Sequence, residues 1–127
     1  MKTRYTVALA MFAGFGLGAV AVQGLHAQAK PPVYSIAEID IVDQAAYSNY
    51  VPKAQAAIKG AGGKIIVAGG KITTIEGEPP KPRVVIQQWD SLEKFQAYRN
   101  SAAFKDLVPI REKVAKFRTF VVEGVPQ

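Results

Sequence analysis

The 127-residue chain carries a net charge of +6 and contains no cysteine and one histidine, His26. The lack of cysteine excludes disulfides, thiolate metal sites and cysteine nucleophiles. The positive charges are spread along the chain, with no run of five like charges, and they are not interleaved with aromatic residues in a nucleic-acid-binding pattern. We therefore expect no nucleic-acid partner.

Residues 1–29 have the three parts of an export signal. A positively charged start, Met1–Arg4, is followed by the uncharged apolar run Val7–Val22 and then by Ala27-Gln28-Ala29, which matches a signal-peptidase site. We therefore expect cleavage at this site, a single mature domain over residues 30–127, and a periplasmic or secreted location.

The alternative is an N-terminal helix that stays uncleaved and anchors the protein in a membrane. The apolar run is close to the ~17-residue lower limit for spanning a bilayer, and Gly14 and Gly18 have the spacing of a helix-packing GxxxG motif. Glycines lower helix propensity, however, and the cleavage pattern lies where it is expected. Both points favour the cleaved signal, and after cleavage we expect no contact with a membrane.

Cleavage would also remove His26. The mature domain would then lack the residue that Ser-His-Asp triads and histidine-ligated zinc or haem require. We therefore predict that the protein uses no cofactor and holds no metal ion.

The mature region begins with an alternating segment, Val33–Val42, which predicts a strand. A helix is expected next, from an N-cap at Asp43 to about Lys59, where glycines end it. Pro52 removes one backbone donor, so we expect a kink or two short helices. One face of the strand would carry Ser35, Ala37, Ile39 and Ile41, and the other Tyr34, Ile36, Glu38 and Asp40.

Two short strands, Lys64–Ala68 and Lys71–Glu76, are predicted after this helix, joined as a hairpin by Gly69-Gly70. Residues 77–82 are rich in proline and charge, which predicts a loop. The following segment, Arg83–Trp89, has an apolar centre that predicts a strand buried on both faces.

The remaining chain predicts two helical segments and a last strand. Asp90 or Ser91 would cap a helix to about residue 100, and Ser101 would begin another, kinked at Pro109. Phe117–Glu123 is expected to be the final strand. The inward-facing residues of the second segment would be Phe104, Leu107, Val108, Ile110 and Val114.

The order of these elements is β-α-β-β-α-β, with a hairpin in the second strand position and a divided second helix. This order predicts an α+β protein with a ferredoxin-like antiparallel sheet and helices on one face. Tyr34, Ile36 and one register of residues 83–89 would leave an apolar surface on the uncovered face. We expect two copies to bury this surface against each other in a twofold homodimer.

Several short motifs, in their order and spacing, resemble the domain of unknown function 1330 family, a member of the dimeric α/β-barrel superfamily. The resemblance covers Val33–Gly124 and implies the βαββαβ fold and the face-to-face dimer, but no particular reaction. The chain departs from the family pattern at Trp89, Tyr98 and Phe104. The motifs are Asp43, Tyr47, Tyr50, Gly62-Gly63, Glu76-Gly77, Arg83-Val84-Val85, Ser91-Leu92-Glu93, Asn100-Ser101, Arg111 and Glu123-Gly124.

Two sets of charged residues are candidates for function. Glu76 and Arg83 flank the proline-rich loop, and Arg83 could bind an anion bidentately at a pocket mouth, although a simple ion pair pinning the loop is the alternative. Glu38 lies with Asp40 on the strand face that would look into the barrel. If it were desolvated there, Glu38 could act as a general base, although solvated carboxylates are more usual at such an edge.

Three further residues are candidates for binding a ligand. Arg111 follows the apolar stripe of the last helix and could reach the cavity or the partner; a surface ion pair is the alternative. Tyr50 and Tyr98 lie on packing faces of their helices. Core packing explains them as well as a ligand contact does.

Three functions are compatible with these residues. The first is an exported homodimer that binds a small, partly apolar or anionic molecule, and the absence of the usual catalytic side chains favours it. The second is a cofactor-independent monooxygenase or isomerase, which the superfamily resemblance implies. The third is a structural or interaction protein without a ligand. Whether the protein is an enzyme is left open by the sequence.

Overall fold

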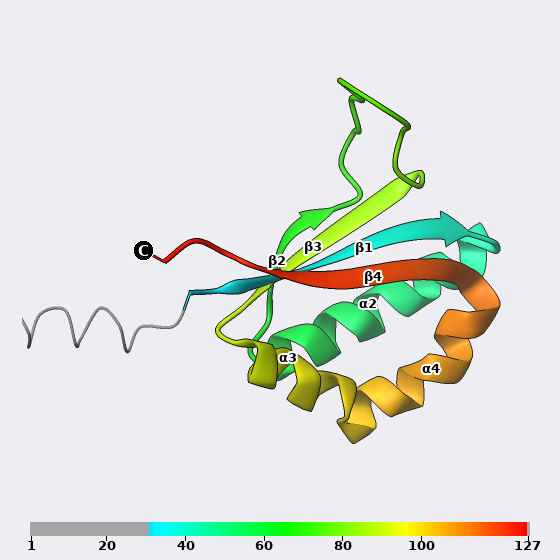
Figure 1. The fold of residues 1–127 in the computed structure, drawn as a ribbon. Coiled ribbons are helices and arrows are strands. Elements are labelled where there is room, and N and C mark those ends of the chain that lie inside the picture. Colours follow the sequence, from blue (N-terminus) through cyan, green and yellow to red (C-terminus); the bar gives the residue numbers. More distant parts are fainter. Residues whose placement is uncertain (1–30, 127) are drawn as a thin grey trace, which may run out of the picture. The chain divides into compact units, whose positions relative to one another are not determined.

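The structure is a computed structural model that describes residues 31–126, so the export signal and His26 lie outside the described residues. The strands form one antiparallel sheet in the order β2-β3-β1-β4 (Figure 1). The elements follow one another along the chain as β1 (Val33–Ile41), α2 (Gln44–Gly60), β2 (Lys64–Ala68), β3 (Arg83–Trp89), α3 (Leu92–Arg99), α4 (Ala102–Val114) and β4 (Ala115–Glu123).

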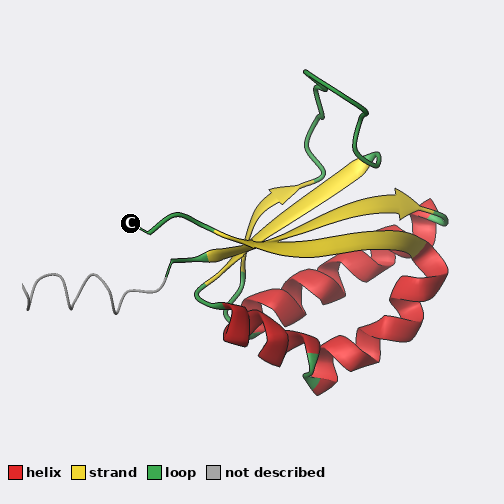
Figure 2. Cartoon of the chain, in the orientation of Figure 1, coloured by secondary structure: helices red, strands yellow, loops and turns green. Residues whose placement is uncertain are grey.

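All three helices cover one face of the sheet, and the other face has no helix over it (Figure 2). The alternation of β1 produces this division, because Ser35, Ala37 and Ile39 are buried whereas the residues between them are only half-buried. The predicted α+β class is therefore confirmed. Among the described residues, no helix is both long enough and apolar enough to span a membrane.

Each helix begins at a side chain that accepts a backbone hydrogen bond. Asp43 accepts from the amide of Ala46 at 3.1 Å, and Ser91 caps α3 in the same way at the amide of Lys94. Pro52 and Pro109 lie inside α2 and α4, each of which is a single helical element. The division of the first helix into two, which Pro52 allowed, is not seen.

Packing between the sheet and the helices forms two clusters of buried residues. Trp89 is central to the cluster below α3: it is 1% exposed, stacks on Tyr98 with ring centroids 5.2 Å apart, and meets the edge of Phe95. The second cluster is centred on Tyr47, Tyr50 and the middle of β1; its buried members are Ala37, Ile39, Tyr47, Tyr50, Ala54, Leu107, Val114 and Ala115.

The segment between β2 and β3 differs from the prediction. Lys71–Glu76 is not a strand but part of a loop that projects away from the sheet (Figure 1). β2 pairs only with β3, and its outer edge stays unpaired because Lys71–Glu76 does not return along it as the predicted hairpin requires. The loop is exposed, with Ile75 85% accessible, and one end is held where the amide of Lys81 donates to Glu38 Oε1 at 3.1 Å.

Two predictions about the last strands also need correction. In β3 only Trp89 is buried and the other residues are half-buried. Arg83, Val85 and Gln87 line the pocket, and no described element covers the residues between them on the second face of the sheet. β4 begins at Ala115 rather than Phe117, since α4 runs directly into extended backbone at that residue.

The two ends of the domain meet where the amide of Gly124 donates to the carbonyl of Pro32 at 2.7 Å.

Candidate functional site

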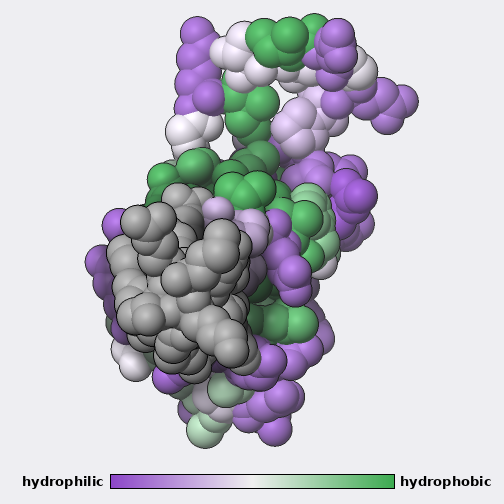
Figure 3. All heavy atoms as spheres, turned by 60° about the vertical axis from the view of Figure 1, so that its left-hand side comes forward, coloured by the Kyte–Doolittle hydropathy of each residue, from purple (hydrophilic) through white to green (hydrophobic). Residues whose placement is uncertain are grey.

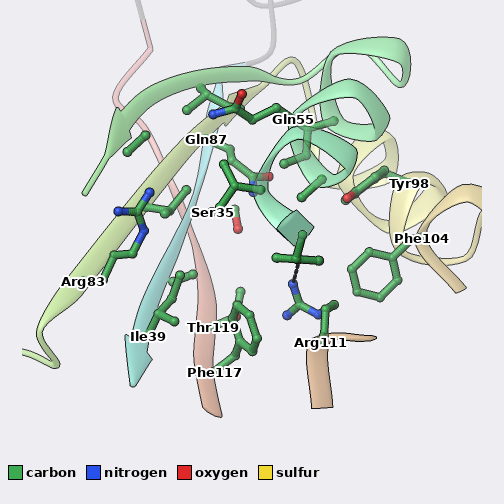
Figure 4. A pocket seen from close by; sticks show the side chains of 18 of the residues that line it. Ser35, Ile39, Gln55, Arg83, Gln87, Tyr98, Phe104, Arg111, Phe117 and Thr119 are labelled. Atoms are coloured by element: carbon green, nitrogen blue, oxygen red, sulfur yellow. Dashed lines mark hydrogen bonds between the residues drawn. The ribbon is translucent and has the colours of Figure 1, made fainter. Parts of the chain in front are cut away.

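A pocket lies between the helix-covered face of the sheet and the three helices (Figure 4). Its wall takes residues from every strand and every helix, so the fold as a whole shapes it. The hollow has about 650 Å³ of empty space out to its mouth, but the centre of a water-sized sphere can occupy only about 60 Å³ of it. An occupant therefore has to be small.

Aromatic and aliphatic side chains make most of this wall. On the α2 side, the ring of Tyr50 lies between those of Tyr47 and Phe117, with centroids 5.8 and 6.3 Å away. On the α3 side, Tyr98 meets Phe104 edge to face at 5.3 Å. Rings in these orientations present a rigid apolar surface to a bound molecule.

Three arginines also line the pocket, and the first is Arg83 at the start of β3. Its Nε donates to the hydroxyl of Tyr47 at 2.9 Å, and its guanidinium lies 5.3 Å from the centre of that ring. Gly69, at φ 74°, lets the loop pass against this guanidinium, because a Cβ there would overlap the Arg83 Nη1 atom.

The other two arginines, Arg99 and Arg111, lie on α3 and α4. Figure 4 shows Arg111 on the opposite side of the pocket from Arg83. Arg111 Nη1 donates to the hydroxyl of Tyr50 at 2.8 Å, and the guanidinium lies 3.8 Å from the centre of the Phe117 ring. Arg99 lies 4.3 Å from the centre of the Phe104 ring. Burial, and to a lesser degree the nearby charge of Arg111, lowers the pKa of Arg99.

The polar groups in the pocket are three guanidiniums, several hydroxyls and the side-chain amides of Gln55 and Gln87. No carboxylate is among the described residues that line it. Burial raises the pKa of Tyr98 to about 12, and it also raises the pKa of Tyr47, where the nearby charge of Arg83 opposes the effect. Both phenols therefore stay protonated at neutral pH and can donate hydrogen bonds, as can the buried hydroxyl of Ser35.

Four of the predicted ligand-binding residues, Tyr50, Arg83, Tyr98 and Arg111, line this pocket. Glu76 does not: it lies in the exposed loop, and Arg83 bonds to Tyr47 instead. This placement contradicts the expected Glu76–Arg83 pairing at a pocket mouth.

Glu38, the candidate general base, is also outside the pocket. It lies on the uncovered face of the sheet, where its Oε2 accepts from Arg118 Nη1 at 2.7 Å. Asp40 is exposed at the end of the same face. The sequence analysis assumed that this face looks into the cavity, whereas the pocket is on the helix side. Across residues 31–126, no three acidic or histidine side chains are grouped to hold a metal ion.

The polar pocket residues that the sequence did not reveal are Ser35, Tyr47, Gln55, Gln87, Arg99 and Thr119. Helical spacing gives a signal for Arg99, because it follows the buried Phe95 by four residues and so shares its face of α3. Tyr47 shares a face with Tyr50 in the same way. For Ser35, the signal was a hydroxyl on the strand face that the helices cover.

Comparison with known proteins supports the fold. A protein of unknown function from Rhodopseudomonas palustris is 15% identical to this chain and has a TM-score of 0.62. The match covers 83% of this chain and 92% of that protein. SnoaB, a cofactor-independent oxygenase from Streptomyces nogalater, is 9% identical and has a TM-score of 0.58. The match covers 76% of this chain and 96% of SnoaB.

A dimeric protein of unknown function with a ferredoxin-like fold, from Bacteroides fragilis, is 12% identical and has a TM-score of 0.52. The match covers 73% of this chain and 96% of that protein. No curated protein matches the chain. Identities this low establish the ferredoxin-like fold alone. The model of domain of unknown function 1330 (DUF1330) matches residues 32–125, which is most of the chain. The chain therefore belongs to the DUF1330 family.

Proposed function

We propose that the protein binds a small, partly apolar anion in the pocket between its sheet and helices. One observation carries the proposal: Arg83, Arg99 and Arg111 line an apolar hollow that no carboxylate neutralises among its described lining residues. Partly buried positive charges are costly unless an anion or aromatic surface compensates them. The aromatic rings provide part of this compensation, and a bound anion would provide the rest.

The shape and donors of the pocket narrow the class of ligand. The apolar wall favours a flat hydrocarbon or aromatic body, and the small enclosed volume excludes large ones. The hydroxyls of Tyr98 and Ser35 add hydrogen-bond donors beside the arginines, and Figure 4 shows the Tyr98 hydroxyl directed toward the interior. An aromatic or unsaturated carboxylate fits all three features.

The experiment is a titration with benzoate, benzyl alcohol and benzylamine, which share a ring and differ in charge. Trp89 is the only tryptophan and stacks on Tyr98, so its fluorescence reports an occupied pocket. Calorimetry checks each affinity independently. We expect benzoate to bind most tightly, less tightly in high salt, and benzylamine least. Equal affinities, or no binding of benzoate at millimolar concentration, would contradict the proposal.

The alternative is a cofactor-independent monooxygenase or isomerase, which the fold shared with SnoaB supports. The arginines could stabilise an enolate, but the pocket offers no carboxylate base among its described residues, and Glu38 lies on the other side of the sheet. These two points favour binding. Oxygen consumption with a panel of hydroxylated aromatic acids tests the alternative, and turnover that survives Glu38→Gln would separate that residue from the reaction.

We also propose that the protein is a homodimer joined through the uncovered face of the sheet. Phe120 and Val122 on β4 are 42% and 50% exposed there, and Ile36 and Ile86 lie beside them on β1 and β3. Figure 3 shows hydrophobic side chains gathered on the surface at the base of the projecting loop. The dimeric Bacteroides fragilis protein of the same fold supports this arrangement.

Export to the periplasm or beyond is a further part of the proposal, and it is supported by the sequence of residues 1–29 alone. Expression in a bacterial host, followed by mass measurement of the periplasmic protein, tests it. A mature chain that begins at Lys30 is expected. Retention of the full-length chain in the membrane fraction would favour the uncleaved anchor instead.

A further inference from the structure

A second hollow adjoins the pocket on the side of α4 and β4. It is wider, with about 540 Å³ accessible to the centre of a water-sized sphere, against about 60 Å³ in the pocket. The two hollows share the wall formed by Arg99, Phe104, Arg111, Phe117 and Thr119. We call the wider space the outer hollow; Glu112 and Lys116 add one charge of each sign to it.

Two like charges meet in the shared wall. The guanidiniums of Arg99 and Arg111 lie 4.3 and 5.1 Å from the centre of the same Phe104 ring. Arg111 has a hydrogen bond to Tyr50, whereas Arg99 donates to no acceptor within the described part of the chain. A half-buried pair of this kind is poorly satisfied by the protein itself, and a carboxylate between the two would remove the repulsion and accept from both.

Arg83, by contrast, is already engaged. It bonds to Tyr47, lies over the ring of that residue, and is closely covered by the backbone at Gly69. Figure 4 shows it on the opposite side of the pocket from Arg111 and Phe104. The pocket is therefore asymmetric, with its least satisfied cation at the α3–α4 end.

From this asymmetry we infer the orientation of the ligand, an inference that rests on the proposed function. The ligand is a monocarboxylic acid whose carboxylate binds between Arg99 and Arg111, in the wall shared with the outer hollow. Its flat apolar body extends into the pocket toward Ser35 and Tyr98. The outer hollow is then the route by which the charged end reaches solvent.

The test compares the affinity for benzoate across charge-removing variants. Arg99→Gln is expected to weaken benzoate binding by about tenfold or more, because charge-assisted hydrogen bonds are lost. Its affinity for benzyl alcohol should stay close to that of the unmodified protein. Arg99→Lys keeps the charge but loses the planar fork, so an intermediate affinity is expected. Lys105→Gln, which removes one exposed charge from α4, is the matched control and should change neither affinity.

The result that would overturn the orientation is a selective effect of Arg83→Gln. If Arg83→Gln abolished benzoate binding and Arg99→Gln left it unchanged, the carboxylate would lie at the β3 end, and the proposed anion-binding function would stand. If no variant changed the affinity for benzoate, both the orientation and the proposed anion-binding function would be wrong. Far-ultraviolet circular dichroism of each variant confirms that the fold is intact.

Discussion

At the scale of single residues, Gly63 lies in close contact with the indole of Trp89. A Cβ at position 63 would lie 2.6 Å from the indole and 2.7 Å from Ile58 Cγ2, inside van der Waals contact. The indole cannot move away, because it is 1% exposed and stacked on Tyr98. Only glycine therefore allows the chain to pass between α2 and β2 at this point.

We predict that Gly63→Ala lowers the free energy of unfolding by about 1–3 kcal/mol, the usual cost of overpacking a core. Gly60 is the matched control, since a Cβ there meets no atom within 4 Å and the residue is helical. Gly60→Ala should be neutral or stabilise by up to about 1 kcal/mol. Urea denaturation measures both; equal stabilities for the two variants would contradict the packing argument.

The phenol of Tyr98 predicts a pH dependence. Burial raises its pKa in the folded protein to about 12, above the ordinary value of 10.0. Between these two values the unfolded chain loses the proton while the folded protein keeps it, so the stability should fall as the pH rises from about 10 to 12. Below pH 10 both states hold the proton, and Tyr98 contributes no slope.

Tyr98→Phe should therefore make the stability less dependent on pH above 10, without changing its dependence near neutrality. Thermal unfolding at a series of pH values measures the slope. A Tyr98→Phe variant with an unchanged slope would show that the phenol is not desolvated in solution.

At the scale of elements, Ser101 joins two helices. Its Oγ accepts from the amide of Phe104 at 3.2 Å, which caps α4, and donates to the carbonyl of Tyr98 at 2.6 Å, which satisfies the end of α3. Ser91 caps α3 with a single bond to the amide of Lys94. The two serines therefore offer a comparison between a double and a single cap.

An N-cap serine contributes about 0.5–2 kcal/mol to stability. We predict that Ser101→Ala costs more than Ser91→Ala, because it also leaves the carbonyl of Tyr98 without its hydroxyl partner. Since Tyr98 and Phe104 line the pocket, Ser101→Ala should weaken benzoate binding as well. Chemical denaturation gives the order of the two costs, and the reverse order would refute the assignment.

The sequence was sufficient for most elements because their periodicity is local. The alternation of β1 and the helical stripe of α2 follow directly from side-chain spacing. The strand expected at Lys71–Glu76 failed for a non-local reason: the amide of Gly69 donates to the carbonyl of Val84, so the chain continues alongside β3 there instead of turning back along the free edge of β2. A strand is stabilised by pairing, and the sequence of one segment does not say whether the segment pairs.

The pocket was harder to predict than the fold. Tyr50, Tyr98 and Arg111 were found because they lie on or next to packing faces, but which side of the sheet holds the pocket depends on where the helices pack. Glu38 was misplaced for this reason. Arg99 was missed because a charged residue next to a buried stripe is usually solvated, and only the position of α4 shows that it is enclosed.

At the scale of the whole molecule, the proposed homodimer depends on the uncovered sheet face. We predict that Phe120→Glu converts the homodimer to a monomer, since it places a charge at the centre of the proposed interface. Leu92→Glu is the matched control: Leu92 is exposed to a similar degree, at 38% against 42%, but lies on α3.

Light scattering measures the mass of each variant at micromolar concentration. The unmodified protein and Leu92→Glu should both have twice the mass of Phe120→Glu. A monomeric unmodified protein would contradict the interface. The pocket lies on the other side of the sheet, within one chain, so the monomeric variant should still bind benzoate.

The hydrogen bond between Gly124 and Pro32 has a consequence for the order of the chain itself. Because β1 starts where β4 finishes, a linker of a few residues could connect them, and the exposed segment at residues 77 and 78 could be opened to give new termini. Such a circular permutant should assemble the same sheet. The fold would then tolerate fusion partners at the start of β3. This point lies at the opposite end of the strands from the start of β1 and the end of β4.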